Sequence, residues 1–343
     1  MVERHQNKKG GDLFMILSAP LHVHWEVTNE CNYRCKHCYQ QNDEKRVTLP
    51  TQELMFIAEQ IVSSGVFQVS ISGGEPFFVN DIFEILDYLS LNNVKIVICS
   101  NGSQIHSDAL KKLQQLSVPV QVSLDSHIAK KHNDFRRSNN AFEDAVDTIR
   151  KLVNSNINTS VAFCATQYNF MDLEGVIKLC IDMGVSNLVI GEMIPIRGGT
   201  AENSNLLFPL ETYNIFTKNI KALIEKYRCF ISIHINSEWG FIVSDFYEHV
   251  PCTAFDRDFA ILSDGSVSPC PFIRNPNYFV GNVLSSTIEE LWMKAKQSKF
   301  YLEKHLGCDN SCTYYEKCLG GCKAQLANTN QDIGRRDLRC PIT

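Results

Sequence analysis

Three cysteines lie close together near the start of the chain, in the segment TNECNYRCKHCYQ. Cys31, Cys35 and Cys38 have the spacing C-x3-C-x2-C. A structural zinc ion usually has four protein ligands. His37 is the only candidate for a fourth here, and as the neighbour of Cys38 it is poorly placed to share one tetrahedral ion with it. Three thiolates suit a [4Fe–4S] cluster that keeps one iron open for another ligand.

Polar motifs follow the next three predicted strands. In Ser72-Gly73-Gly74-Glu75-Pro76 the glycines allow a ligand to approach the backbone, and Glu75 offers an acceptor to an ammonium group. Ser100-Asn101-Gly102 and Ser123-Leu124-Asp125, each an ordinary turn when taken alone, end the two strands after that. All of these motifs lie at the carboxyl ends of consecutive parallel strands, where α/β folds bind ligands.

A second group of cysteines occupies the C-terminal part of the chain. Its seven members are Cys252, Cys270, Cys308, Cys312, Cys318, Cys322 and Cys340. Taken alone, the four between 308 and 322 indicate a zinc site, because closely spaced pairs of thiolates are typical of one.

Strand-like and helical patterns alternate from residue 21 onward. We expect strands over 21–28, 66–72, 94–100, 118–124, 159–165 and 188–194, and helices over 50–64, after Asn80, after Ser107, over 141–153, around 173–181 and near 211–227. Such a series predicts a parallel sheet with right-handed crossovers. Periodicity alone does not separate an open doubly wound sheet from a partial barrel. After residue 236 only one clear helix remains, over 288–297, where Thr287 and Glu290 form a capping box. We expect metal sites to stabilise this tail.

Composition and charge exclude several classes of protein. The chain has 343 residues, 44% of them hydrophobic, and a net charge of −5, which argues against disorder and against a nucleic-acid partner. No window approaches the roughly 18 apolar residues of a membrane span, and the apolar stretch 13–17 is too short for a signal peptide. We therefore expect a cytoplasmic protein without a membrane partner, whose 14 cysteines stay reduced and bind metal.

The first cysteine motif, followed by Tyr39, resembles that of the radical S-adenosylmethionine (SAM) superfamily. The resemblance implies a partial (β/α)6 TIM-type barrel in which the open iron holds SAM. Reductive cleavage of SAM then gives a 5′-deoxyadenosyl radical that abstracts hydrogen from a substrate, with electrons from an external flavodoxin- or ferredoxin-type donor. The cofactor-binding residues that it implies are Tyr39, the GGEP-like Gly73, Gly74, Glu75 and Pro76, then Ser100, Asn101, Ser123, Asp125 and Arg136.

The tail resembles the SPASM extension of these enzymes, which holds two auxiliary iron–sulfur clusters of the [4Fe–4S] type. By this resemblance Cys252, Cys270 and Cys322 bind the first auxiliary cluster, and Cys308, Cys312, Cys318 and Cys340 bind the second. We accordingly divide the chain into an N-terminal tail (1–19), a radical SAM partial barrel (20–236) and a SPASM domain (237–343).

Three features depart from the family pattern. The pair Cys308-x3-Cys312 replaces a usual C-x2-C. The segment 241–251 lacks the eighth cysteine of many relatives, so the first auxiliary cluster either has an open iron or takes Asp245, Glu248 or His249 as a ligand. Pro271 follows Cys270 where the sulfatase-maturing branch has an aspartate thought to act as a base, which counts against that activity.

Other cysteines and histidines receive structural roles. We expect Cys99, Cys164, Cys180 and Cys229 to be buried as small hydrophobic residues, although Cys164 lies near the mouth of the barrel and is a candidate hydrogen donor. For His22 and His24, which flank Val23 in the first strand, a role in the core or at the bottom of the barrel is favoured over metal binding.

The resemblance leaves three functions open. The first is maturation of a ribosomally made peptide or protein by crosslinking, epimerisation or oxidation. The second is modification of a small molecule, haem or another cofactor. The third, a non-catalytic iron–sulfur carrier or sensor, would not need the motif 72–76. The segment before the first strand is too short for a winged-helix leader-binding domain, so leader binding is expected from a separate protein or from the barrel. The polar loop PIRGGTAEN (195–203) is a candidate substrate contact.

Overall fold

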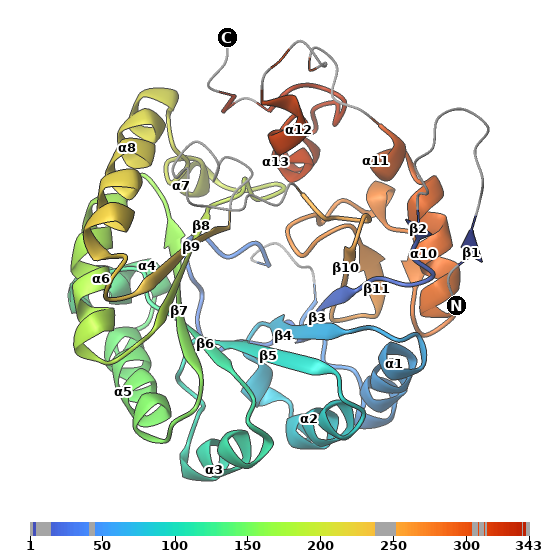
Figure 1. The fold of residues 1–343 in the computed structure, drawn as a ribbon, viewed down its shortest axis with the longest axis horizontal. Coiled ribbons are helices and arrows are strands. Elements are labelled where there is room, and N and C mark those ends of the chain that lie inside the picture. The colour runs from blue at the N-terminus through green and yellow to red at the C-terminus, as the bar shows by residue number, and fades with distance from the viewer. Residues whose placement is uncertain are drawn as a thin grey trace.

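The computed structural model describes residues 3–4, 15–40, 45–236, 252–303, 308, 312, 314–337 and 339–340. A ten-stranded sheet with the order β12-β11-β10-β3-β4-β5-β6-β7-β8-β9 forms its centre. The sheet curves into an open barrel with the helices on its outside (Figure 1). A separate two-stranded sheet pairs β1 (Glu3–Arg4) with β2 (Met15–Ile16).

The parallel part of the sheet alternates with helices, as the sequence predicts. Its strands are β3 (His22–Thr28), β4 (Gln68–Gly73), β5 (Lys95–Ser100), β6 (Val120–Ser123), β7 (Thr159–Ala165), β8 (Asn187–Glu192) and β9 (Ser232–Asn236). The helices are α1 (Thr51–Ser63), α2 (Ile82–Leu91), α3 (Ser107–Leu116), α4 (Ala129–Arg136), α5 (Ala141–Asn154), α6 (Leu173–Asp182), α7 (Ala201–Ser204) and α8 (Leu210–Tyr227). The partial barrel is thereby confirmed, with β9 as a parallel strand beyond the six expected.

The tail extends the same sheet. Strand β10 (Asp258–Ile261) pairs in parallel with β3, and β11 (Ser266–Ser268) and β12 (Gly281–Asn282) continue it in antiparallel fashion. The tail helices are α10 (Ile288–Gln297), α11 (Lys299–Leu302), α12 (Tyr315–Cys318) and α13 (Lys323–Asn328). The predicted capping box of α10 is present, because the Thr287 side chain accepts from the Glu290 amide and the Glu290 side chain accepts in return.

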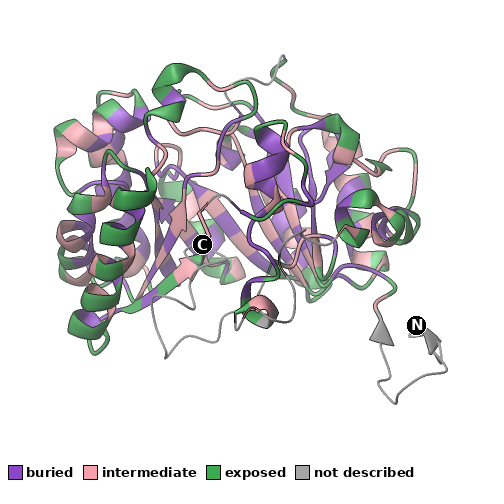
Figure 2. Cartoon of the chain, turned by 90° about the horizontal axis from the view of Figure 1, so that it is seen from above, coloured by how far each residue is buried: buried purple, intermediate pink, exposed green. Residues whose placement is uncertain are grey.

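One hydrophobic core joins barrel and tail. Strand residues that face the helices are fully buried, among them Val23 and Trp25 of β3, and Figure 2 shows the buried strands enclosed by helices whose outer faces are exposed. Phe259 of β10 and Trp292 of α10 belong to the same core and contact each other with ring centroids 6.0 Å apart. The tail therefore shares the core of the barrel.

Some local expectations were wrong. Asp81 and His106, not Asn80 and Ser107, occupy the cap positions before α2 and α3, because α2 begins one residue later, and α3 one residue earlier, than the expected cap would require. Cys229 is exposed, since it follows the end of α8 in the turn before β9. Cys99 and Cys164 are partly exposed, whereas Cys180 is fully buried as expected. Within the described ranges, no helix combines the length and the apolar content that a membrane crossing requires.

Candidate functional site

The loop after β3 brings the first three cysteines together. Cys35 belongs to a small buried cluster with Tyr33 and Ala141, and Cys31 and Cys38 pack against it. Burial raises the pKa of each thiol, and the charge of a neighbouring cysteine raises it further: Cys35 acts on Cys31, Cys38 on Cys35, and Cys31 on Cys38. The three sulfurs therefore share one electrostatic environment.

Hydrogen-bond donors and a cation surround these sulfurs. The Tyr33 amide and the Asn101 Nδ2 donate to Cys31 Sγ at 3.4 and 3.7 Å. Arg136 Nη1 lies 3.8 Å from Cys35 Sγ, and its charge lowers the pKa of that thiol, which burial raises to about 11. Donors and positive charge stabilise thiolates, the form in which cysteine binds a metal.

The three sulfurs do not all lie within 4.8 Å of one another, as the ligands of a single ion would. Among the described residues, the only three metal-type side chains whose ligand atoms lie within 4.8 Å of one another are His22, His24 and Asp258. In a tetrahedral zinc site with Zn–S bonds of about 2.3 Å, the sulfurs would lie about 3.8 Å apart. Thiols that are close but more widely spaced suit a multi-iron cluster.

Gly73 and Gly74 bring the ends of β3 and β4 into close contact. Gly73 has a φ of +138°, and a Cβ there would lie 2.0 Å from the Thr28 carbonyl oxygen. A Cβ at Gly74 would lie 1.9 Å from the Glu30 carbonyl oxygen. Only glycine fits these positions, and the close approach places the loop of Glu75 beside the cysteine loop.

Glu75 is a buried carboxylate whose hydrogen-bond donors are all neutral. It accepts from Ser100 Oγ and the Asn101 amide at 2.8 Å each, and from the Phe77 amide at 3.4 Å in the turn that begins at Pro76. Burial raises its pKa to about 7. A carboxylate held in this way fits an ammonium group, which would supply the missing positive charge.

A buried ion pair holds Arg136 against the cysteine loop. Asp125, after β6, accepts from Arg136 Nε at 2.6 Å and pairs with Nη2 at 2.5 Å. Asp125 also accepts from the Cys164 amide at 2.9 Å, which places Cys164 near the same group. Ser123 ends β6 and is half-buried. Sequence reasoning identified Arg136 but missed helix α4, which carries it.

Two aromatic residues of the cysteine loop lie in different surroundings. The His37 ring stacks on Phe135 at 4.4 Å, and burial holds its pKa well below the usual range. Tyr39, predicted to bind the cofactor, contacts the tail: its ring meets Phe272 edge-on at 5.3 Å, and the Arg274 guanidinium lies 4.9 Å above it.

The loop 195–203 packs between the cysteine loop and the tail. Asn203 Nδ2 donates to the Lys36 carbonyl at 2.6 Å, and Asn328 Nδ2 donates to the Pro195 carbonyl at 2.8 Å. This predicted substrate contact therefore lies beside the cysteines at the mouth of the barrel.

Four of the tail cysteines act on one another electrostatically. Burial raises the pKa of Cys308, and the charges of Cys318, Cys340 and Cys312 raise it further; Cys312 and Cys340 likewise act on Cys318. Cys252 acts electrostatically on Lys323, the residue after Cys322. Cys270, in the turn after β11, packs against the main core. Asp245, Glu248 and His249 lie outside the described residues.

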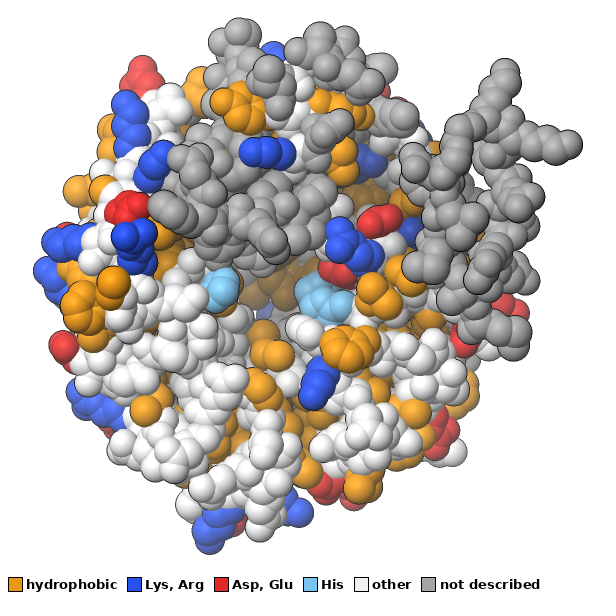
Figure 3. All heavy atoms as spheres, viewed as in Figure 1, with side chains coloured by type: hydrophobic (Ala, Val, Ile, Leu, Met, Phe, Trp, Pro, Cys, Tyr) orange, Lys and Arg blue, Asp and Glu red, His pale blue; other side chains and the backbone are white. Residues whose placement is uncertain are grey.

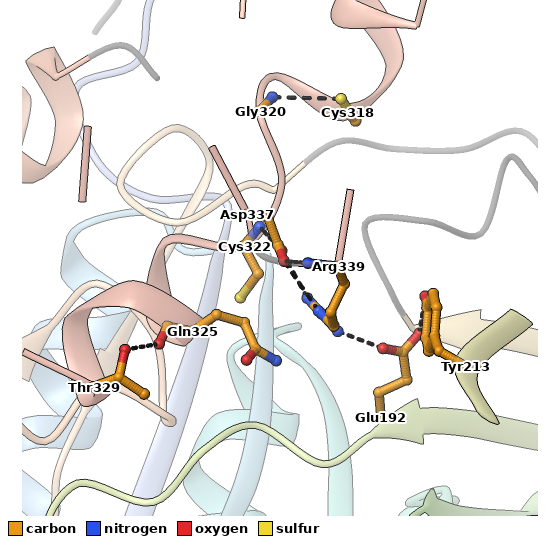
Figure 4. Close-up of polar contacts among 9 residues, drawn as sticks. All are labelled: Glu192, Tyr213, Cys318, Gly320, Cys322, Gln325, Thr329, Asp337 and Arg339. Carbon is orange, nitrogen blue, oxygen red and sulfur yellow. Dashed lines mark hydrogen bonds and ion pairs between the residues drawn. The ribbon is translucent and has the colours of Figure 1, made fainter. Parts of the chain in front are cut away.

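A network of charges that sequence reasoning missed joins the barrel to this tail (Figure 4). Arg339 forms ion pairs with Glu192, at the end of β8, and with Asp337. Asp337 Oδ2 accepts from the Cys322 amide at 2.9 Å, and the Tyr213 hydroxyl donates to Glu192 at 2.9 Å. The position of Arg339 beside Cys340 was the one available signal, since Glu192 lies far away in the sequence.

Known proteins share both parts of this architecture. The family model "Radical SAM superfamily" matches residues 25–201, and "Iron-sulfur cluster-binding domain" (SPASM) matches residues 252–323. The chain is 26% identical to mycofactocin maturase MftC of Mycobacterium tuberculosis (94% of this chain, 83% of the relative). It is 24% identical to the subtilosin biosynthesis protein AlbA of Bacillus subtilis (91% and 69%), and 24% identical to the AdoMet-dependent heme synthase of Oleidesulfovibrio alaskensis (88% and 82%).

The fold is also that of solved structures. Streptococcus suis SuiB bound to SAM superposes with a TM-score of 0.79 at 19% identity, covering 95% of this chain and 78% of that one. SuiB bound to the precursor peptide SuiA gives 0.80 at 19% identity, covering 95% and 77%. SAM and a [4Fe–4S] cluster are the cofactors of the first domain, and auxiliary iron–sulfur clusters are those of the second. With one family model covering more than half of its length, this chain belongs to the radical SAM superfamily of enzymes and carries a SPASM domain.

Proposed function

We propose that this enzyme matures a ribosomally made peptide or protein by abstracting a hydrogen atom from one of its residues. The observation that carries the proposal is the extent of the similarity to proteins named as maturases. The match to mycofactocin maturase runs over 94% of the chain and so includes barrel and tail alike. The likeness to SuiB with its precursor peptide, and the similarity to AlbA, support the same substrate class.

We assign the radical-generating site to the mouth of the barrel. Cys31, Cys35 and Cys38 would hold the cluster, and the Glu75 carboxylate would accept from the ammonium group of SAM. Arg136, fixed by Asp125, would face the carboxylate of SAM and lower the pKa of Cys35. The bound cluster and SAM supply the 5′-deoxyadenosyl radical, and the chain's own residues position the reactants and exclude water.

The two sets of tail cysteines would hold the auxiliary clusters, divided as the SPASM pattern implies. The mutual electrostatic effects among Cys308, Cys312, Cys318 and Cys340 support the second set. An external flavodoxin- or ferredoxin-type protein would supply electrons. The loop 195–203, which contacts both the cysteine loop and the tail, would line the path of the peptide. A separate leader-binding protein completes the proposed set of partners.

A second candidate is modification of a tetrapyrrole. Haem synthases match the chain at 23–24% identity over 88–96% of its length, nearly the extent of the maturases. The two functions differ in the substrate that stimulates turnover.

The test is a substrate comparison in the reconstituted enzyme. The full chain is loaded anaerobically with iron and sulfide, reduced with dithionite and given SAM. It then receives either short peptides encoded beside its gene or a tetrapyrrole precursor. We expect a peptide to increase formation of 5′-deoxyadenosine and to change in mass itself, while a variant lacking Cys31, Cys35 and Cys38 forms none.

Stimulation by the tetrapyrrole alone, with a change in its mass, would overturn the peptide proposal in favour of the second candidate. SAM cleavage that no peptide stimulates, with no peptide changed in mass, would contradict peptide maturation as well. Both outcomes leave the family assignment intact.

A further inference from the structure

A cluster of two histidines and an aspartate lies at the end of the barrel opposite the cysteine loop. His22 and His24 stand at the start of β3, and Asp258 begins β10, where it pairs in register with His22. The cysteine loop follows the other end of β3. At about 3.3 Å per residue, the six steps from His22 to Thr28 span about 20 Å. The cluster is therefore separate from the proposed SAM site.

The three side chains converge from the inner face of the sheet. In β3 the two histidines alternate with Val23 and Trp25, which face the helices and are fully buried. One ring nitrogen of each histidine and a carboxylate oxygen of Asp258 all lie within 4.8 Å of one another. Figure 3 shows histidine side chains on both sides of a hollow in the middle of one face, and Figure 1 places β3 and β10 on its right-hand side.

The distances leave room for an ion. His22 Nδ1 lies 4.0 Å, and His24 Nε2 3.8 Å, from Asp258 Oδ2. Both exceed the roughly 2.7–3.2 Å of a direct hydrogen bond. A tetrahedral ion with bonds of about 2.0–2.2 Å would set its ligand atoms about 3.4 Å apart, so the two nitrogens would each move about half an ångström closer to Oδ2 on binding.

Neighbouring residues orient the ligands. Ser70 of β4 hydrogen-bonds to His22 Nε2 at 2.8 Å, which leaves Nδ1 directed at the cluster. The Thr253 hydroxyl donates to Asp258 Oδ2 at 2.5 Å. Metal-binding histidines and carboxylates regularly have such partners, which fix the ring orientation. The side chains keep exposed fractions of 21%, 31% and 18%, so that solvent reaches the remaining coordination position.

We propose that His22, His24 and Asp258 bind one divalent transition-metal ion, with water in the remaining position. Two imidazoles and one carboxylate form a ligand set used for Zn²⁺ and for non-haem Fe²⁺. The ion would connect the first strand of the barrel to the first strand of the tail, and so would stabilise the join between them.

Zinc serves as the probe, because its ligands are distinguishable from cluster sulfurs. One equivalent of Zn²⁺ is added to the full chain with its iron–sulfur clusters loaded, and zinc K-edge X-ray absorption and metal analysis follow. We expect one zinc per chain with only nitrogen and oxygen ligands, at about 2.0–2.2 Å. His24→Gln and Asp258→Asn should each weaken zinc binding at least tenfold, measured against a chromophoric chelator.

The matched control is His234→Gln, at an exposed strand histidine of the same sheet outside the cluster, which should bind zinc as the unaltered chain does. Sulfur ligands in the zinc spectrum, no retained zinc, or unchanged affinity in both cluster variants would each overturn the proposal. If one variant fails to fold, the zinc spectrum of the unaltered chain and the zinc affinity of the other variant still test the proposal. None of these measurements depends on SAM cleavage.

Discussion

At the residue scale, the chemistry of the barrel mouth depends on charges that the protein holds away from water. Glu75 is fully buried and its donors are neutral, so the protein disfavours its ionised form. A bound ammonium group would reverse this balance. In the proposed function, the amine of SAM supplies that positive charge.

Replacing Glu75 with glutamine should weaken SAM binding. The variant keeps the shape of the side chain but loses the charge-assisted hydrogen bond, which is worth about 1.5–3 kcal/mol and hence about 10- to 100-fold in affinity. The affinity of the unaltered protein should rise between pH 6 and pH 8, because the Glu75 pKa is about 7 and the cation binds its deprotonated form. The Glu75→Gln variant should lack this rise. Anaerobic equilibrium dialysis measures both effects.

The same raised pKa has a consequence for stability. Without SAM, a carboxyl group whose pKa is higher in the folded state than the ordinary 4.5 costs stability as pH rises from about 4.5 to about 7. The unfolding temperature of the unaltered protein should therefore fall over that range relative to that of Glu75→Gln, whose side chain does not ionise. Glu84→Gln, at an exposed residue in the first turn of α2, is the control for both Glu75 predictions and should change neither SAM affinity nor the pH dependence of unfolding. Equal effects of the two substitutions on SAM affinity would contradict the role assigned to Glu75.

Asp125 should matter for stability as well as for the site. Asp125 is buried and pairs with Arg136, whose side chain is 9% exposed. Breaking such a pair by removing one charge costs about 3–5 kcal/mol, because the other charge stays buried. We expect Asp125→Asn to lower the free energy of unfolding by that amount in urea titrations followed by circular dichroism. Asp108→Asn removes an exposed partner of Lys111 and should leave stability unchanged; a similar loss in both variants would show that the buried pair is not the cause.

At the element scale, the sequence predicted the strands and helices whose apolar residues recur at regular spacing. The six strands and the helices with clear apolar stripes, such as α1 and α5, lie where the pattern placed them. Helix α4 was not predicted, because Ala129 and Phe135 are its only apolar residues and do not form an apolar stripe. Strand β11 was not predicted, because three residues are too few to show alternation.

A substitution where the ends of β3 and β4 meet can test how strictly these strands position the site. Gly74→Ala would place a Cβ within 1.9 Å of the Glu30 carbonyl oxygen, so the loop of Glu75 must move away from the cysteine loop. We expect at least tenfold weaker SAM binding and a lower unfolding temperature. Gly191→Ala in β8 is the control, because no atom lies within 4 Å of its added Cβ. Unchanged SAM binding in Gly74→Ala would mean that the close approach does not position Glu75.

At the scale of the whole molecule, the structure joins two regions that the sequence separates. Cysteine spacing identified the candidate ligands of the tail, but pairing of β10 with β3 and the ion pair of Arg339 with Glu192 connect residues far apart in the chain. No local pattern encodes such contacts, since they depend on where the barrel closes. The tail cysteines could be proposed as ligands from their spacing in the sequence. The charge network of Arg339, Glu192 and Asp337 could not be predicted in this way.

This network should determine whether the tail retains its iron. Asp337→Ala removes the acceptor of the Cys322 amide and one of the two anions around Arg339, so the polar link between Cys322 and the residue before Cys340 is lost. Three [4Fe–4S] clusters correspond to about twelve irons per chain. We expect the variant to contain about four to eight while SAM binding at the barrel mouth persists, measured by iron analysis and equilibrium dialysis. Asp332→Ala, an exposed residue of the same segment, should keep about twelve. Full iron content in Asp337→Ala would show that the clusters do not depend on the network, and loss of SAM binding together with the iron would show that barrel and tail fold as one unit.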